Sequence, residues 1–314
     1  MAEKNKRNFI DYLLIGLRGM AMGAVDVVPG MSGGTIALIT GIYHELILSI
    51  KSFNINLLHT LRKQGIRAAW DQVNGRFLLA LVAGVLISIF SLARLMSWLL
   101  EHHAMQVWAF FFGLIVGSAI FVGMRINRWS LRAILFLLAG TALAYWVTIA
   151  TPASTPDNMW FIFLSGSIAL CAMILPGVSG AFILILLGKY EFMLQAAAHL
   201  NIPVIAMFGM GGIAGLLAFS HLIGYLFKTH PNATLALLAG FMAGSLNKLW
   251  PWKHLLETRL GTDGQEVPLL ERSISPWTYA EIYGQDPMLL PVILFALAGL
   301  ALITVFTILE ARKK

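Results

Sequence analysis

Residues 28–35 read Val-Pro-Gly-Met-Ser-Gly-Gly-Thr and interrupt an apolar stretch that extends from residue 9 to residue 50. A related sequence, Leu-Pro-Gly-Val-Ser-Gly-Ala-Phe, occupies residues 175–182 and interrupts the apolar stretch 158–200 in the same way. Proline cannot continue a helical hydrogen-bond ladder, and glycine adopts backbone conformations that other residues avoid. We therefore predict that one helix ends and another begins at each of these two Pro-Gly turns.

The composition is typical of an integral membrane protein. Hydrophobic residues make up 58% of the 314 positions and charged residues 12%, and the mean hydropathy is +0.79, far outside the range of soluble domains. Because lipid offers no hydrogen-bond partners, apolar runs of about twenty residues must span it as helices. The sequence thus predicts an all-α polytopic membrane protein. Its net charge of +7 is interpreted as a topology signal, and we expect no nucleic-acid partner.

The sequence carries no pattern that calls for a metal ion, a cofactor or a catalytic residue. Cys171 is the only cysteine, so one chain can form neither a disulfide nor a thiolate metal site. His103 and His230 lie in matching polar connections and have no histidine or carboxylate at metal-ligand spacing. We expect no metal, no cofactor and no enzymatic activity.

Three pairs of segments repeat in the same order, which is typical of an internal duplication. The pairs are 29–43 with 176–190, 98–118 with 225–245, and 135–148 with 294–307. The offset in residue number between the two members of a pair changes only across the polar segments 51–76 and 248–288, where insertions are tolerated. We therefore divide the chain into repeat 1, residues 10–150 with a broken hairpin at 10–50, and repeat 2, residues 151–314 with a broken hairpin at 158–200.

Each repeat adds three apolar segments to its broken hairpin, and an odd number of crossings inverts the second repeat. The six segments are 77–100, 105–124, 131–150, 204–227, 233–247 and 289–308. With the N-terminus inside, the inner connections hold 15 Lys and Arg residues and the outer connections hold 5, which agrees with the positive-inside rule. We expect the tail 1–9 and the C-terminus in the cytoplasm and the loop 248–288 in the periplasm.

Inverted repeats with broken helices at corresponding positions are typical of secondary transporters, which bind substrate near the membrane midplane. The apolar segments beside each turn are long enough either to span the membrane or to form a re-entrant hairpin, so both arrangements stay open. A plain kink or surface loop between two helices is the alternative interpretation of a Pro-Gly dipeptide.

The helix after the first turn is expected to start near Ser32, with unpaired N–H groups, the positive end of its dipole and the hydroxyls of Ser32 and Thr35 nearby. Such a helix start suits an anion. The second copy replaces Gly34 by Ala181 and Thr35 by Phe182, so the two sites are not equivalent. The substrate-binding candidates in the turns are Gly30, Ser32, Gly33, Gly34, Thr35, Gly177, Ser179 and Gly180.

Two further candidates are charged residues at membrane depth, where a charge is costly and is therefore a functional candidate. Arg18 and Asp26 lie eight residues apart, close to one helical face. Arg18 is the first choice for a phosphate contact, since its guanidinium binds two oxygens at once. Asp26 either carries a proton or balances the charge of Arg18, and Glu45 is a second candidate for proton coupling. Arg94 lies near a helix end, from which its side chain can reach the interface.

Residues 26–47, DVVPGMSGGTIALITGIYHELI, and their echo at 174–191, ILPGVSGAFILILLGKYE, carry a family resemblance. Over essentially its whole length, the chain resembles the bacterial undecaprenyl-phosphate translocases, a family of polyprenyl-phosphate transporters. The resemblance implies that undecaprenyl phosphate, the lipid carrier of cell-wall precursors, is moved from the outer to the inner leaflet of the bacterial cytoplasmic (inner) membrane for reuse. It also implies paired re-entrant helices in an inverted repeat. A homo-oligomer is left open.

Two other functions compete with this one. A membrane phosphatase acting on polyprenyl pyrophosphate can carry a Pro-Gly-x-Ser-Arg-Ser motif, but Gly33 and Gly34 follow Ser32 here and no arginine does. A secondary transporter of a small soluble anion shares the expected architecture. It predicts an aqueous cavity without a lateral opening to lipid.

Overall fold

A computed structural model of the chain describes residues 7–26, 31–260 and 266–311, and these are mostly helical, as predicted. The first half contains α1 (Phe9–Asp26), α2 (Gly33–Ile39), α3 (Tyr43–Lys51), α4 (Ile55–Gln72), α5 (Gly75–His102), α6 (Ala104–Met124) and α7 (Leu131–Ile149). The second half contains α8 (Met159–Ile174), α9 (Gly180–Leu186), α10 (Tyr190–Ala198), α11 (Ile202–Thr229), α12 (Pro231–Leu249), α13 (Pro276–Tyr283) and α14 (Leu289–Ala311). Residues 1–6 of the expected tail lie outside the described part of the chain.

The order of helix lengths is nearly the same in the two halves. Helices α1, α2, α3, α5, α6 and α7 have 18, 7, 9, 28, 21 and 19 residues. Helices α8, α9, α10, α11, α12 and α14 have 16, 7, 9, 28, 19 and 23 residues. The elements without a counterpart are α4 in the first half and α13 with the strands before it in the second, within the segments where sequence spacing changed.

Both Pro-Gly turns lead into a short helix that begins as predicted. Ser32 is the N-cap of α2 and Ser179 is the N-cap of α9, each with an extended backbone. Serine is favoured there because its hydroxyl accepts a bond from one of the unpaired N–H groups of the first turn. Each short helix then bends sharply into the next, by 115° between α2 and α3 and by 108° between α9 and α10.

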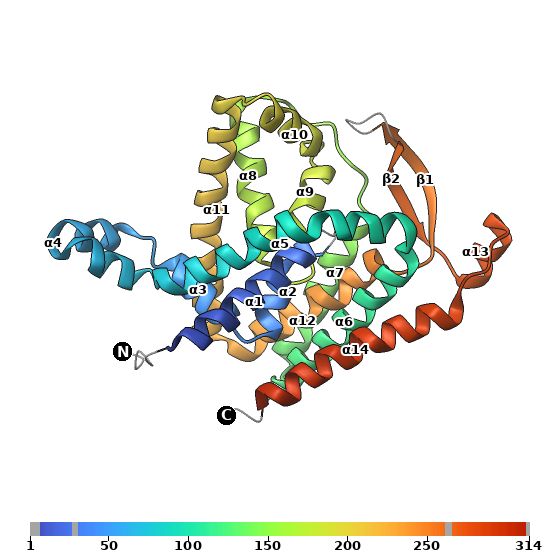
Figure 1. Cartoon of the computed structure of the whole chain (residues 1–314), viewed down its shortest axis with the longest axis horizontal. Helices are drawn as coiled ribbons and strands as arrows, with labels where there is room; N and C mark the ends of the chain where they lie inside the picture. The colour runs from blue at the N-terminus through green and yellow to red at the C-terminus, as the bar shows by residue number, and fades with distance from the viewer. Residues whose placement is uncertain (1–6, 27–30, 261–265, 312–314) are drawn as a thin grey trace.

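Five of the described helices are long and apolar enough to cross a membrane, or up to seven if each bent pair counts as one span. The sequence predicted six spans outside the hairpins, and α12 is the one that is long enough but not apolar enough. Helix α12 packs against α6 and α7 near the centre of the molecule and buries eleven of its residues (Figure 1). A helix that mostly faces protein does not need the apolar surface that lipid demands.

Glycines let helices from the two halves approach closely. A Cβ at Gly113 of α6 would lie 1.8 Å from the carbonyl oxygen of Ala296 in α14. A Cβ at Gly240 of α12 would lie 2.2 Å from the carbonyl oxygen of Leu137 in α7. Backbones this close leave no room for a side chain, so glycine is required at both positions. Helix α6 corresponds to α12 and α14 to α7, so the two halves exchange equivalent contacts.

The loop 248–288 contains structure that the sequence analysis did not predict, and this corrects a strictly all-α description. Strands β1 (Lys253–Leu260) and β2 (Glu266–Ser273) pair in an antiparallel, two-stranded sheet. Figure 1 places this sheet and α13 on the opposite side of the molecule from α4, which projects from the helical body beside α3. The polar connection 51–76 is likewise mostly helical, because it contains α4.

Candidate functional site

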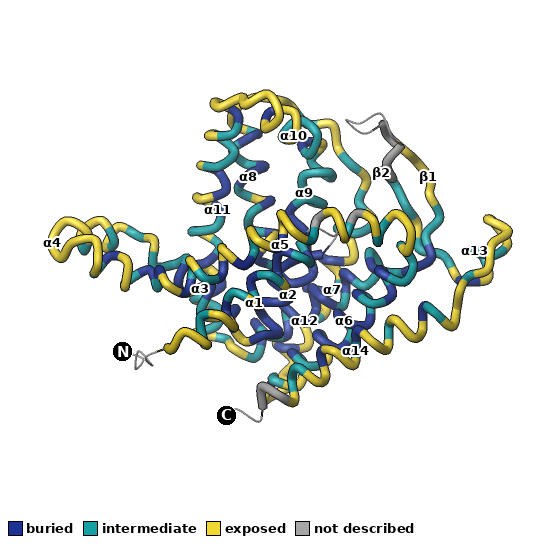
Figure 2. Tube along the Cα trace, in the orientation of Figure 1, coloured by how far each residue is buried: buried dark blue, intermediate teal, exposed yellow. Residues whose placement is uncertain are grey.

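The two Pro-Gly turns meet in the interior, although about 140 residues separate them in the sequence. The Ser32 Oγ donates a hydrogen bond to the carbonyl oxygen of Met173 at 2.6 Å. The Thr35 Oγ1 accepts one from the backbone N–H of Gly177 at 3.0 Å. Ser32 and Thr35 are both buried, and α2, which begins here, lies in the densely buried centre of Figure 2. The first turn is thus hydrogen-bonded directly to the second.

Close backbone packing reinforces these two bonds. A Cβ at Gly34 would lie 2.2 Å from the carbonyl oxygen of Ile174, at the end of α8. No real side chain tolerates that distance from a backbone atom, so only glycine fits between the two turns at this point. Gly34 therefore has a packing role in the contact with the second half, whereas Gly33 packs against Asp26 and Met22 of α1.

The amides at the start of α2 already have internal partners, which differs from the expectation of unpaired N–H groups. The Asp26 Oδ1 accepts a hydrogen bond from the Gly33 N–H at 2.7 Å, and the Ser32 Oγ accepts one from the Gly34 N–H at 3.1 Å. Asp26 therefore caps α2 across the turn. Among the described residues, no ion pair joins Asp26 to Arg18 in this conformation.

The conformation of the second turn is determined more by glycine backbone geometry than by side-chain hydrogen bonds. Gly177 has a φ of +83°, which only glycine adopts without strain. The Ser179 Oγ accepts a bond from the Phe182 N–H at 3.4 Å, at the start of α9. A Cβ at Gly180 would lie 2.5 Å from the carbonyl oxygen of Ala169 in α8. Gly30 of the first turn lies outside the described residues.

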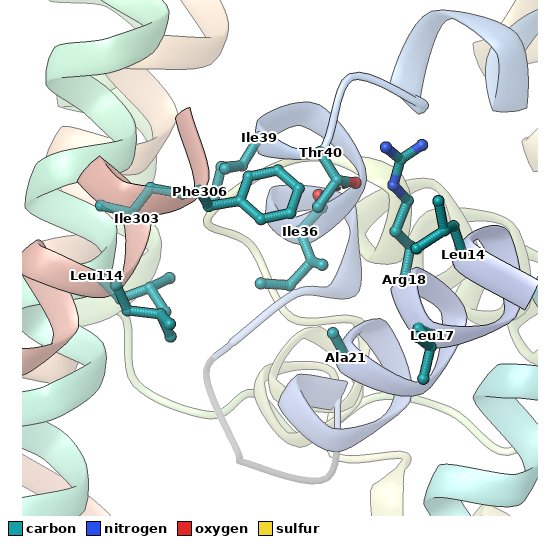
Figure 3. A pocket seen from close by; sticks show the side chains of 11 residues that line it. Leu14, Leu17, Arg18, Ala21, Ile36, Ile39, Thr40, Leu114, Ile303 and Phe306 are labelled. Carbon is teal, nitrogen blue, oxygen red and sulfur yellow. Dashed lines mark hydrogen bonds between the residues drawn. The ribbon is translucent and has the colours of Figure 1, made fainter. Parts of the chain in front are cut away.

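Arg18 lines a cavity of about 460 Å³ at the side of the first turn. Its other lining residues come from four helices and are Leu14, Leu17, Ala21, Ile36, Ile39, Thr40, Leu114, Leu302, Ile303 and Phe306. Figure 3 shows the Arg18 side chain extending from α1 beside the end of α2 that carries Thr40. The cavity thus combines one guanidinium and one hydroxyl with walls that are otherwise apolar.

In this cavity Arg18 is unpaired within the described part of the chain, and the cavity opens to the outside of the molecule. Among the described residues, Arg18 has no hydrogen-bond or ion-pair partner, so its donors are available. The wall residues Leu17 and Leu302 are 52% and 54% exposed, so the cavity opens at the apolar flank of the molecule, between α1 and α14. Arg18 is therefore beside α2 but away from the capped start of that helix, where Ser32 lies.

Glu45 belongs to a polar network at the start of α3. Its carboxylate accepts two hydrogen bonds from the Arg7 guanidinium, at 2.6 and 2.7 Å, and one from the Asn74 side-chain amide at 2.7 Å. Arg7 comes just before α1 and Asn74 just before α5. Glu45 therefore ties three segments of the first half together at one end of the molecule.

A related network with reversed charges joins the start of α10 to the segment before α8. Lys189 is 1% exposed, and its ammonium donates to the carboxylate of Asp157 and to the carbonyl oxygen of Thr155, the latter at 2.8 Å. The rings of Phe161 and Phe192 lie 5.7 and 5.5 Å from the ammonium. The burial of Lys189 was not predicted from the sequence, because a lysine in an outer connection is expected at a solvated helix end.

Two further lysines lie where α12 meets the β1–β2 sheet. Lys248 forms an ion pair with Glu271 at 2.9 Å and lies 5.0 Å from the ring of Phe182. The Lys253 ammonium donates to the Asn247 carbonyl oxygen at 2.5 Å and to the Ser273 Oγ at 2.8 Å. Burial, together with the charge of Lys248, lowers the pKa of Lys253 to about 8. These lysines hold the sheet against the end of α12, close to Phe182 of α9.

Of the predicted site residues, the structure brings Ser32, Thr35 and Gly34 into contact with the second turn, while Arg18 and Glu45 lie in separate environments. The sequence analysis missed the apolar walls around Arg18. Their signal was present, since Leu14, Leu17 and Ala21 surround Arg18 at helical spacing and mark a single face of α1.

These features define a multi-pass membrane protein of the transporter class, with two bent helix pairs whose preceding turns are hydrogen-bonded to each other and a laterally open cavity that carries an arginine. Residues 22–267 match a family model described as undecaprenyl phosphate translocase-like. The chain belongs to this family. The family description is that of a transporter and not of an enzyme.

Two relatives support the assignment, and both are named polyprenyl-phosphate transporter. The one from Vibrio cholerae serotype O1 is 42% identical over 294 residues, which cover 94% of this chain and 96% of the relative. The one from Staphylococcus aureus is 32% identical over 254 residues, which cover 75% of this chain and 85% of the relative. No solved structure matches the chain.

Proposed function

We propose that this chain moves undecaprenyl phosphate from the outer to the inner leaflet of the bacterial cytoplasmic membrane, so that the carrier lipid is reused in cell-wall synthesis. The substrate class follows the names of its two relatives. The observation that carries the proposal is the cavity beside α2, which combines an unpaired guanidinium with apolar walls and a lateral opening.

The chemistry of a polyprenyl phosphate fits this cavity. The phosphate is a dianion with oxygens that a guanidinium binds in pairs, and Arg18 supplies that group. The prenyl tail is apolar and can remain in lipid while the head moves. A cavity with apolar walls such as Ile36 and Phe306, opening where Leu17 and Leu302 are exposed, suits a ligand of this kind.

In this proposal the turns form the barrier that the phosphate must pass. The residues Gly30, Ser32, Gly33, Gly34, Thr35, Gly177, Ser179 and Gly180 contact the headgroup in turn as the two halves separate. The amides of Gly33 and Gly34 and the hydroxyls of Ser32 and Thr35, now paired internally, then exchange their partners for phosphate oxygens. Exchange of one hydrogen bond for another keeps the barrier low.

We propose that the two halves are inverted-topology repeats and that each bent pair is a re-entrant hairpin. The repeated helix lengths, the bends of 115° and 108° and the excess of Lys and Arg in the inner connections support this. Both ends of the chain are then cytoplasmic. In Figure 1 the start of α1 and the end of α14 lie toward the same side, which agrees with this topology.

The lateral opening and the sequence of the first turn separate this function from its rivals. A transporter of a small soluble anion needs an aqueous path, and apolar walls with a lipid-facing mouth serve it poorly. A phosphatase of a polyprenyl pyrophosphate would share the lipid-facing mouth, but the sequence lacks the arginine of the phosphatase motif, since Gly33 and Gly34 follow Ser32. We therefore favour a lipid substrate that is moved without covalent change.

The test is exchange of a polyprenyl phosphate between leaflets of proteoliposomes. Arg18→Ala should slow exchange roughly tenfold or more, since a hydrogen bond to a charged group contributes about 1.5–3 kcal/mol. Arg18→Lys should retain part of the activity. Arg94→Ala is the matched control, because it removes an exposed arginine of α5 that lies outside the cavity.

Three outcomes would contradict the proposal. Equal exchange by wild type and Arg18→Ala would remove Arg18 from the phosphate path. Uptake of a water-soluble anion without lipid exchange would favour the soluble-anion transporter. Release of phosphate from a polyprenyl pyrophosphate would favour the phosphatase.

Energy coupling to protons through Asp26 or Glu45 is part of the same proposal. Asp26 is the better placed, because its carboxylate caps the helix at the contact between the turns. Glu45 is held by Arg7 and Asn74 at the end of the molecule. Exchange that continues undiminished after the pH gradient and the membrane potential are collapsed would exclude coupling through either residue.

A further inference from the structure

Helix α4 is the part of the structure that the transport function leaves unexplained. It has no counterpart in the second half and contacts the rest of the molecule mainly through the start of α5. Figure 1 shows it projecting from the body, and Figure 2 shows that most of its surface is exposed. Five large apolar side chains are exposed on it: Ile55, Leu58, Leu61, Ile66 and Trp70.

These apolar residues are arranged as in an amphipathic helix. Ile55, Leu58 and Leu61 are each three residues apart, so they lie along one side of the first segment, and Arg62, four residues after Leu58, lies on that side too. His59 and Lys63 are four apart on another side. At Gly65 the backbone leaves the helix, with φ +81° and ψ 178°. After this break, Ile66 and Trp70 are again four residues apart.

Helix α4 carries three basic residues and one acidic residue, a net charge of +2. Arg62, Lys63 and Arg67 are exposed, and Asp71 is the single acidic residue of the helix. Helix α4 is not among the helices apolar enough to cross a membrane. A basic helix with an exposed apolar side, too polar to span, is typical of elements that lie in the membrane interface.

The structure also fixes where α4 rejoins the body. Asn74, which directly follows the helix, donates to Glu45, and Glu45 binds Arg7 of the segment before α1. Ala69 and Val73 are buried, so the end of α4 is anchored. The helix therefore projects from the end of the molecule that carries the N-terminal segment, where the inner connections hold most of the Lys and Arg residues.

We propose that α4 binds the surface of the membrane leaflet beside it, with its apolar residues inserted between lipids and its basic residues on anionic phospholipid headgroups. Charge complementarity selects this occupant, because anionic lipids attract basic juxtamembrane segments. The side chains of Ile55 and Ile66, which are 77% and 80% exposed, are then covered by acyl chains. Gly65 allows the two short segments to follow the surface independently.

A depth measurement tests this in the full chain reconstituted into vesicles. In a Cys171→Ser background, a nitroxide label at Leu58→Cys reports collisions with lipid-soluble oxygen and with a water-soluble nickel chelate. Vesicles of phosphatidylcholine alone are compared with vesicles that also contain phosphatidylglycerol. We expect the Leu58 label to be reached by oxygen and shielded from the chelate, more so with phosphatidylglycerol. A label at Lys63→Cys should stay accessible to the chelate.

Two further sets of variants test whether binding requires the basic residues of α4. Arg62→Glu with Lys63→Glu and Arg67→Glu should abolish the effect of phosphatidylglycerol on the Leu58 label. The matched control, Arg62→Lys with Arg67→Lys, should keep it. A Leu58 label equally open to the chelate in both lipids would overturn the proposal. A label shielded from both reagents would also overturn it, since that indicates contact with protein, such as a second copy of the chain.

Discussion

The two Pro-Gly turns have similar sequences but contribute different groups to their contact. The first turn contributes side chains, since the Ser32 and Thr35 hydroxyls reach across to the second half. The second contributes backbone, through the Met173 carbonyl oxygen and the Gly177 N–H. At the position of Thr35 the second turn carries Phe182, which has no hydroxyl.

The two turns therefore have different roles in this contact. In a symmetric contact between two identical turns, each donor–acceptor pair would occur twice. The first turn supplies polar side chains, and the second has the unusual backbone of Gly177, whose φ is +83°. The arginine of the lateral cavity also lies in the first half only. The halves are similar in fold and unequal in chemistry.

The largest effect is expected from Gly34→Ala. The added Cβ would lie 2.2 Å from the Ile174 carbonyl oxygen, so the turns must separate. Overpacking against backbone should lower the free energy of unfolding by about 3 kcal/mol or more. Thermal unfolding of the purified protein in detergent measures this. The second turn already carries Ala181 at the equivalent position, so the substitution tests the asymmetry directly.

The control for this variant is Gly209→Ala. Gly209 lies in α11, and a Cβ there would meet no atom within 4 Å. Alanine favours a helix over glycine by up to about 1 kcal/mol, so this protein should be as stable as wild type or slightly more so. Equal stabilities of the two alanine variants would show that the turns are not packed as described.

A smaller effect is expected from Thr35→Val. Valine has the shape of threonine without the hydroxyl, so the buried Gly177 N–H loses its acceptor. An unpaired buried N–H costs about 2 kcal/mol. Thr35→Ser should be close to wild type. The comparison is Thr40→Val, whose hydroxyl donates within its own half to the Ile36 carbonyl oxygen, an atom that also accepts the Thr40 N–H. If Thr40→Val destabilised the protein more, the bond between the halves would be unimportant.

Local features of the fold were predictable from the sequence. Ser32 and Ser179 start helices because a serine after a glycine turn is a good N-cap. The six apolar segments outside the hairpins each became a helix, α12 included. In the β1–β2 segment the signal was overlooked: Asp263-Gly264 separates two runs of strand-forming length, and an Asp-Gly pair is a strong hairpin signal.

The candidate site was predicted less completely, because it depends on contacts between distant residues. The sequence suggested that the start of α2 offers unpaired amides. In the structure, however, the carboxylate of Asp26, seven residues before Gly33, accepts the Gly33 N–H. Whether a carboxylate pairs with a nearby arginine or with an amide depends on the path of the chain between them. Spacing alone placed Asp26 and Arg18 on one face and could not decide between the two partners.

The smallest effect on stability is expected from breaking the charged pairs beside the two hairpins. Arg7 and Asp157 each precede the first helix of their half and each binds the start of the later hairpin helix, at Glu45 and Lys189. The Arg7–Glu45 side chains are 32% and 27% exposed, so solvent and salt weaken that pair. Lys189 is almost fully buried, so its ammonium depends on Asp157.

Asp157→Ala should therefore lower the free energy of unfolding by about 1 kcal/mol more than Arg7→Ala, because it leaves a buried charge whose one remaining acceptor among the described residues is the Thr155 carbonyl oxygen. Adding salt should reduce the effect of Arg7→Ala and leave that of Asp157→Ala nearly unchanged. The double variant Asp157→Ala with Lys189→Met should recover most of the loss, since an apolar side chain beside Phe161 and Phe192 needs no partner. Failure of this recovery would mean that Asp157 stabilises the second half through contacts other than the lysine.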